Sequence, residues 1–209
     1  MMSLPVPALA EAVAAEWAAQ DGTVRPLSMP MMRLAVTAID RVGRERAAVV
    51  AQLAAYGAHD LLCYRASAPE SLVRRQAETW QPLLDWCART YGAPLAATEG
   101  VTHVGQPPAA LAALRAAVDA MDDFRVAALS QLTAACGSLV IGLAVCAGRI
   151  GAAEAIAASQ LDEAWQAEKW GLDGEAETRR KNLAQEIIDA ARFLDLLECD
   201  PRATGCLAR

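Results

Sequence analysis

A long apolar stretch without charged residues runs from Val126 to Gly148. About 20 predominantly apolar residues are enough to cross a membrane, but much of this stretch is alanine, cysteine and polar residues. Small residues also occupy every fourth position at Ala134, Ser138 and Gly142, so another helix can approach closely. A helix that is hydrophobic all round is typical of the buried centre of a soluble bundle. We therefore interpret 126–148 as a buried central helix, with a membrane span as the alternative.

Apolar residues recur with helical spacing along most of the remaining chain. Leu9, Val13 and Trp17 follow one another at every fourth position, which predicts a helix, and Pro7 stands where prolines commonly open one. Pro82 lies inside another helical pattern, and we predict a break there because an internal proline removes a helix hydrogen bond. The other helices are expected at about 31–42, 44–56, 69–80, 82–91, 107–121, 152–169 and 173–198.

Two short segments predict β-structure. Residues 60–66, DLLCYRA, are apolar and aromatic and have turn signals on both sides, and 94–104 contains a second segment of this kind. Ser67 and Glu70 then have the spacing of a capping box at the start of the next helix. The predicted fold is α+β but mostly α, with several helices packed as an orthogonal bundle around the central helix and a small β element beside them.

The composition indicates a folded domain with an acidic C-terminal third. The chain has 209 residues, of which 55% are hydrophobic and 21% are charged, and its net charge is -6. Twelve acidic and five basic residues lie in 151–200. Nucleic-acid binding needs clustered Lys and Arg, so it is disfavoured. The acidic segment fits either a solvated helix face or a surface for a basic or polar protein partner.

Residues that could support catalysis or metal binding are scarce. The two histidines, His59 and His103, lie outside any local ligand motif, and the six cysteines lack paired spacing. We expect satisfied or surface histidines, reduced and packed thiols, and neither a metal nor a cofactor. Nucleophile-elbow and phosphate-loop motifs are also missing, which disfavours an enzyme. Without the features of a signal peptide, the protein is expected to be cytoplasmic.

The most distinctive segment is LDEAWQAEKWG at 161–171. Leu161 and Trp165 are four residues apart, so an apolar ridge runs beside a polar one on the predicted helix. The tryptophans of this segment suit either a core or a binding surface. Glu163 is harder to bury, because a buried carboxylate needs a partner, and a surface or interface position is more natural for it.

Several blocks of the chain resemble, in the same order, the ATP12-type assembly chaperones, which act on the alpha subunit of the F-type ATP synthase catalytic head. The segment DEAWQAEKWG at 162–171 is similar to the acidic and aromatic signature of that family. The chain departs from the usual pattern at Met31, Met32, Val36 and Gln81. The other similar blocks are LAEAVAAEWAAQ at 9–20, MPMMRLAVTAIDRV at 29–42, DLLCYRA at 60–66, TWQPLLDW at 79–86 and GSLVIGLA at 137–144.

The resemblance implies a domain organisation. The family normally has several strands before the helix that contains Trp17, so we expect a truncated N-terminal α/β subdomain, of which 1–25 is the remnant. Residues 26–199 are then the mainly helical chaperone domain. The segment 200–209 is expected to be a frayed tail.

The resemblance also implies a function and a set of residues. Such chaperones bind the free alpha subunit and mask its beta-facing interface until assembly, without acting as enzymes. The alternative is a helical small-molecule-binding protein or enzyme of unknown substrate. A monomer without nucleic-acid partners or stable membrane insertion is expected. Partner-binding roles are predicted for Asp162, Glu163, Trp165, Gln166 and Trp170, and structural roles for Trp17, Trp80 and Trp86, with Trp17 in the core.

Overall fold

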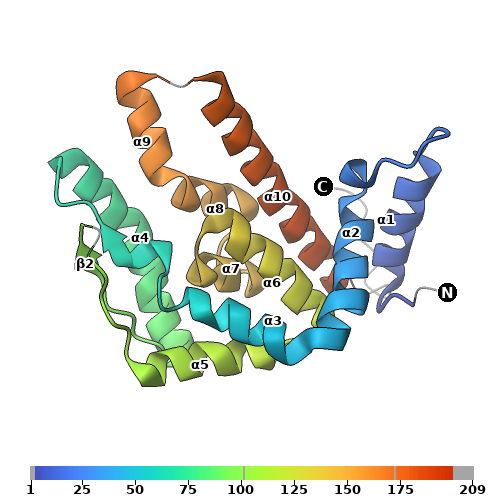
Figure 1. Ribbon diagram of the computed structural model, residues 1–209, viewed down its shortest axis with the longest axis horizontal. Helices are drawn as coiled ribbons and strands as arrows, with labels where there is room; N and C mark the ends of the chain where they lie inside the picture. The colour runs from blue at the N-terminus through green and yellow to red at the C-terminus, as the bar shows by residue number, and fades with distance from the viewer. Residues whose placement is uncertain (1–2, 101, 172, 200–209) are drawn as a thin grey trace.

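The computed structural model describes residues 3–100, 102–171 and 173–199. They form a mostly helical molecule with one very small sheet (Figure 1). The α-helices are α1 (Pro7–Ala18), α2 (Pro30–Val36), α3 (Gly43–Tyr56), α4 (Glu70–Tyr91), α5 (Pro108–Asp119), α6 (Asp123–Cys136), α7 (Leu139–Cys146), α8 (Ala152–Ser159), α9 (Leu161–Trp170) and α10 (Gly174–Glu198). Three short helical elements are η1 (Pro26–Ser28), η2 (Thr37–Val42) and η3 (Leu61–Cys63), and the strands are β1 (Tyr64–Arg65) and β2 (Thr98–Glu99).

The predicted central helix is two helices, α6 and α7, and the prediction of one helix at 126–148 is wrong. Gly137 ends α6 with a positive φ of 64°, a conformation that glycine adopts without steric cost. Ser138 then caps α7, and its hydroxyl accepts from the Ile141 N–H at 3.0 Å. Both helices are buried along most of their length. The central position of this segment is confirmed (Figure 1).

The α6–α7 break is held by a carboxyl group, that of the fully buried Asp60. One of its oxygens accepts from the Ser138 hydroxyl at 2.7 Å and from the Leu62 N–H at 3.1 Å. The other oxygen accepts from the Val140 N–H at 3.0 Å. Burial raises the pKa of Asp60, although these hydrogen bonds oppose the rise. Asp60 thus joins the segment before β1 to the first turn of α7.

The β element is shorter than the sequence predicts. Among the described residues, only Tyr64–Arg65 and Thr98–Glu99 are strands, and they pair in parallel with Tyr64 opposite Thr98 and Arg65 opposite Glu99. The remainder of the predicted strand 60–66 is largely the turn η3, because Asp60 caps it instead of continuing into an extended chain. The α+β and mostly helical class is confirmed.

Two further helix boundaries differ from the prediction. Helix α4 continues through Pro82, whereas the predicted helix at 152–169 is interrupted at Gln160 and becomes α8 and α9. The predicted capping box at Ser67 is not formed, since the N-cap of α4 is Pro69, which has no side-chain hydrogen bond. Asp122 caps α6 and accepts from the N–H groups of its first turn.

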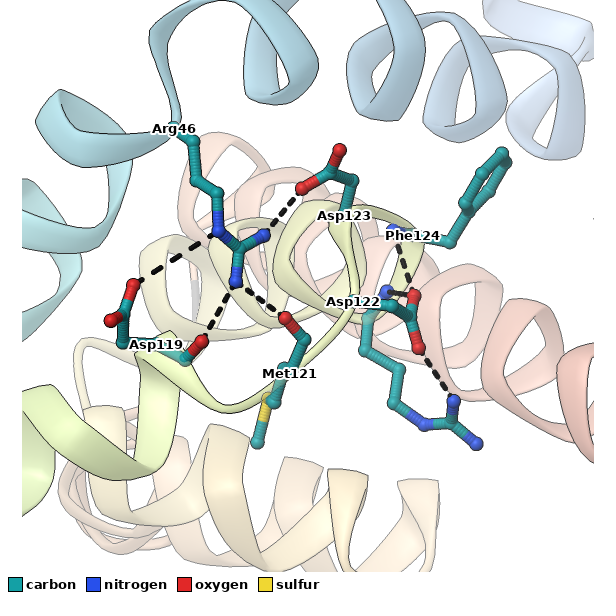
Figure 2. Close-up of polar contacts among 7 residues, drawn as sticks. Arg46, Asp119, Met121, Asp122, Asp123 and Phe124 are labelled. Atoms are coloured by element: carbon teal, nitrogen blue, oxygen red, sulfur yellow. Dashed lines mark hydrogen bonds and ion pairs between the residues drawn. The ribbon is translucent and has the colours of Figure 1, made fainter.

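Arg46 of α3 holds the corner between α5 and α6 (Figure 2). Its guanidinium donates to the carbonyl oxygens of Asp119 at 2.9 Å and Met121 at 2.5 Å, and it forms an ion pair with Asp123 in the first turn of α6. The last carbonyls of a helix lack partners within the helix. One side chain therefore satisfies the end of α5 and fixes the start of α6.

The three tryptophans with predicted structural roles differ in burial. Trp80 has no exposed surface, and its Nε1–H donates to the Ala158 carbonyl at 2.8 Å, which joins α4 to α8. Trp86 is half-buried and its ring meets that of Tyr91 edge-on at 5.4 Å. Trp17 is 46% exposed, so its predicted place in the core is wrong. The stripe that α1 does bury consists of Leu9 and Val13.

In the described part of the chain, no helix is both long enough and apolar enough to span a membrane. The uncharged stretch at 126–148 is divided by the Gly137 turn, and its apolar side chains are covered by neighbouring helices. The membrane-helix alternative for this segment is therefore wrong. The predicted tail at 200–209 lies outside the described residues.

Candidate functional site

A groove of about 490 Å³ lies between α9 and α10. Helix α9 and the first turns of α10 project from the body of the molecule, while the rest of α10 lies along α6 (Figure 1). The floor of the groove is formed by small and apolar side chains from the end of α6, and its two walls carry charged residues. The lining residues are Leu61, Ala134, Ala135, Cys136, Gly137, Ser159, Gln160, Glu163, Gln166, Ala167, Gly171, Asp173, Ala176, Arg179, Arg180 and Leu183.

Gln160 fixes the base of the groove. Its side chain is only 7% exposed and lies at the break between α8 and α9. The amide nitrogen donates to the Arg180 carbonyl at 3.0 Å, and the amide oxygen accepts from Arg180 Nε at 3.1 Å. This pair of hydrogen bonds joins the start of α9 to α10. The interruption of the predicted long helix therefore sets the direction in which α9 leaves the core.

One face of α9 is occupied by contacts with α4. Asp162 accepts from the Gln76 amide at 2.8 Å, and Trp165 Nε1–H donates to the Ser71 hydroxyl at 3.2 Å. Farther along, Arg75 donates two hydrogen bonds of 2.7 Å to the Glu168 carboxylate, which holds the pKa of Glu168 below its usual value. Two of the predicted partner-binding residues, Asp162 and Trp165, are thus engaged within the chain.

The opposite face of α9 carries Glu163 and Gln166 into the groove. Both side chains are exposed, and within the described residues neither has a hydrogen bond or ion pair. Arg179, on the α10 wall of the same groove, is likewise exposed and lacks such a contact among the described residues. The groove therefore combines an apolar floor with one available carboxylate and one available guanidinium.

Trp170 ends α9 at the rim of the groove, next to the lining residue Gly171. Its side chain is 74% exposed, and its ring meets the buried Trp165 edge-on with centroids 5.6 Å apart. Lys169 also lies over the Trp165 ring at 5.9 Å. A large apolar surface that is held in place yet open to solvent is typical of interaction sites.

The groove lacks the features of an active site. Its one thiol belongs to Cys136, and burial raises the pKa of Cys136 to about 12, so the reactive thiolate is suppressed. Among the described residues, no group of three or more His, Cys, Asp or Glu side chains is placed to hold a metal. Cys63, Cys87, Cys136 and Cys146 are free and buried or half-buried, in agreement with the expectation of packed thiols, and Cys206 lies outside the described residues.

The sequence did not predict the α10 wall of the groove. Arg179, Arg180 and Asp173 line this wall, whereas the predicted partner-binding residues all lie in 161–171. The available signal was the helical spacing of Ala176, Arg179 and Leu183, which places them on one side of α10. Leu183 is half-buried and faces the groove.

Comparison with known proteins decides the family. A family model described as ATP12 chaperone protein matches residues 1–88. Two structures of Atp12 from Paracoccus denitrificans, one of them a point mutant, have 47% sequence identity with this chain, cover 94% of it and superpose with a TM-score of 0.90. The match spans 84% of the Paracoccus chain. This chain belongs to the ATP12 chaperone family.

A third solved structure extends the comparison. The Atu1473 protein of Agrobacterium tumefaciens has 39% identity with this chain, a TM-score of 0.85, and a match over 94% of this chain and 73% of that one. The ATP12 family consists of ATP synthase assembly chaperones and not of enzymes, which confirms the resemblance found in the sequence. The alternative of an enzyme is therefore wrong.

Proposed function

We propose that this ATP12-family protein binds the free alpha subunit of the F-type ATP synthase and masks its beta-facing interface until the catalytic head assembles. The observation that carries the proposal is the groove between α9 and α10, where Glu163 has no hydrogen bond or ion pair among the described residues and lies in the segment that resembles the acidic and aromatic signature of the family. A subunit of an obligate hetero-oligomer exposes a large apolar interface. Such a surface aggregates unless a chaperone covers it.

The residues of α9 divide between two roles in this proposal. Glu163, Gln166 and Trp170 contact the client, because they are exposed at the groove or its rim. Asp162 and Trp165 act indirectly, since their hydrogen bonds to α4 hold α9 at the angle that opens the groove. Of the five residues to which the sequence assigned partner binding, the proposal keeps three as direct contacts with the client.

The charges of the groove specify a complementary client surface. Glu163 favours a basic client side chain, whereas Arg179 favours an acidic one, and both charges stand over a floor of alanine and glycine. Charge complementarity speeds association and selects the partner more than it adds affinity. The affinity then comes mainly from the apolar floor and from Trp170, since aromatic anchors dominate many interfaces.

The test is co-expression of this chain with the alpha subunit of the same organism, comparing the unmodified protein with Glu163→Lys. We expect the variant to capture at least tenfold less soluble alpha subunit, because it places a cation where the client supplies one. Glu11→Lys is the matched control, since Glu11 is exposed on α1, a helix that contributes no residue to the groove and lies away from α9 (Figure 1). It should capture the client normally.

A second variant separates the groove from the rest of α9. Arg179→Glu reverses the charge of the other wall, and we expect it to reduce capture as well while the melting temperature stays within 2 °C or so of the parent, as is usual for exposed positions. Normal capture by both folded groove variants would show that the client binds elsewhere. An equal loss of alpha-subunit capture in the Glu11→Lys control would show that the net charge of the chain, and not the groove, controls binding.

A further inference from the structure

The only two histidines of the chain lie together in the structure. His59 is in the turn that follows α3, and His103 is in the segment that follows β2. The two histidines are 44 positions apart in the sequence. Their ring centroids are 5.0 Å apart and the ring planes are inclined by 42°. Both side chains are exposed, so neither is explained by the packing of a core. This pair lies outside the groove described above.

A third polar group is attached to this pair. The Tyr64 hydroxyl lies 3.3 Å from Nδ1 of His103, and Tyr64 belongs to β1, which pairs with β2 just before His103. The parallel pairing therefore brings the Tyr64 phenol to the His103 ring. A hydrogen bond at Nδ1 orients the ring and leaves Nε2 as the nitrogen for another ligand.

We propose that His59 and His103 form a binding site for a divalent transition-metal ion of the zinc type. Imidazole nitrogens bind zinc at about 2.0–2.1 Å, so the ring centre, about 1.1 Å from its nitrogen, lies about 3.2 Å from the metal. Two rings on a tetrahedral ion then have centres about 5 Å apart. The observed separation of 5.0 Å matches this value.

Tyr64 is the positioning residue of the site. When the metal occupies Nε2 of His103, the Nδ1–H donates to the Tyr64 oxygen, and such outer hydrogen bonds hold ligating histidines in the required tautomer. No third His, Cys, Asp or Glu ligand joins the pair among the described residues, so water completes the coordination. The site is consequently open and exchangeable, and it links the end of α3 to the segment after β2.

The experiment is a titration of the untagged chain with zinc chloride, followed by calorimetry and by proton NMR of the imidazole rings. Because the chain has two histidines, two Hε1 signals are expected, and both should shift together and saturate at one zinc ion per chain. His59→Gln and His103→Gln should each weaken binding at least tenfold. Tyr64→Phe should weaken it about tenfold, the lower end of the range for outer-shell partners.

A matched variant in which Cys146, Cys199 and Cys206 are changed to serine tests whether zinc binds to these thiols instead. Zinc binding at the histidine pair should be unchanged in this variant, and its loss would overturn the proposal. Independent movement of the two Hε1 signals, or unchanged affinity in either histidine variant, would also overturn it. The imidazole signals report the site directly, so the outcome does not depend on client binding at the groove.

Discussion

Neighbouring residues in this sequence have different environments because each helix turn rotates side chains by about 100°. Asp162 is half-buried against α4, whereas Glu163 is exposed in the groove and has no hydrogen bond or ion pair among the described residues. The sequence alone indicated that Glu163 was poorly suited to a core. It could not indicate that Asp162 and Trp165 were already satisfied, because their partners Gln76 and Ser71 are about 90 residues away in the chain.

Asp60 provides a prediction about pH at the scale of one residue. Its pKa is raised in the folded protein, first by burial, so the folded state holds the proton more tightly than the unfolded state does. The contribution of Asp60 to stability is therefore fully present below its unfolded pKa of about 4 and declines as the pH rises through the folded pKa. Asp60→Asn cannot ionise and lacks this decline.

We expect Asp60→Asn to be less stable than the parent by about 1–3 kcal/mol at pH 4, because the amide nitrogen, unlike either oxygen of the carboxyl group, cannot accept the hydrogen bond from Ser138 or Val140. The difference should become smaller toward pH 8. Urea unfolding at several pH values measures it. A difference that grows with pH would contradict the raised pKa, and Asp85→Asn, at an exposed position on α4, is the control.

At the scale of elements, breaks between helices determine the architecture more than the helices themselves do. The turn at Gly137 folds α7 back onto α6, so that a Cβ added at Gly142 would lie 2.8 Å from Leu129 and 3.1 Å from Thr133. The recurring small residues did predict a close helix contact. The approaching helix is the first half of the same stretch, which the spacing of small residues cannot reveal.

Arg46 offers a test of how one such corner is fixed. Arg46→Ala removes the donors to the carbonyls of Asp119 and Met121 and the partner of Asp123, and we expect a loss of about 2 kcal/mol in the free energy of unfolding. Arg46→Lys keeps the charge but loses the planar fork, so it should recover only part of that loss. Hydrogen exchange should rise at 119–124 in both variants. Unchanged exchange there would show that the corner is held by packing alone.

At the scale of the whole molecule, the proposed client surface is the groove between two helices that are each held to the core. Helix α9 is held to α4 and α10 is held to α6, while the groove between α9 and α10 has charged walls available for a partner (Figure 1). A chaperone that covers an assembly interface must leave when the proper subunit arrives. The proposed function therefore includes mutually exclusive binding.

This exclusivity gives a prediction for the purified complex. Adding beta subunit to the complex of this chain with alpha subunit should release the chaperone as beta concentration rises, because both partners bind the same alpha surface and compete by mass action. Release should proceed without ATP hydrolysis, since the family is not enzymatic. Size-exclusion chromatography measures it. A stable ternary complex would contradict a shared surface, and beta subunit unable to bind alpha is the control.

Local patterns were sufficient for several features. The helical spacing around Leu9 and Val13 and the order of the family-like blocks predicted a mostly helical chaperone. Local patterns gave wrong predictions where the environment of a residue depends on segments that are distant in the sequence. Trp17 continues the stripe of Leu9 and Val13 in the sequence, yet it is 46% exposed, because periodicity identifies a face of a helix and not how far along that face the neighbouring elements extend.

The sequence by itself determined the helical class, the buried character of 126–148 and the unusual nature of 161–171, because periodicity, uncharged length and residue type act over a few turns of chain. Only the tertiary structure decided which side of α9 is free, how Asp60 joins segments 78 residues apart, and that His59 meets His103. Such contacts depend on loop closure between distant segments, whose geometry is set by all the packed helices together.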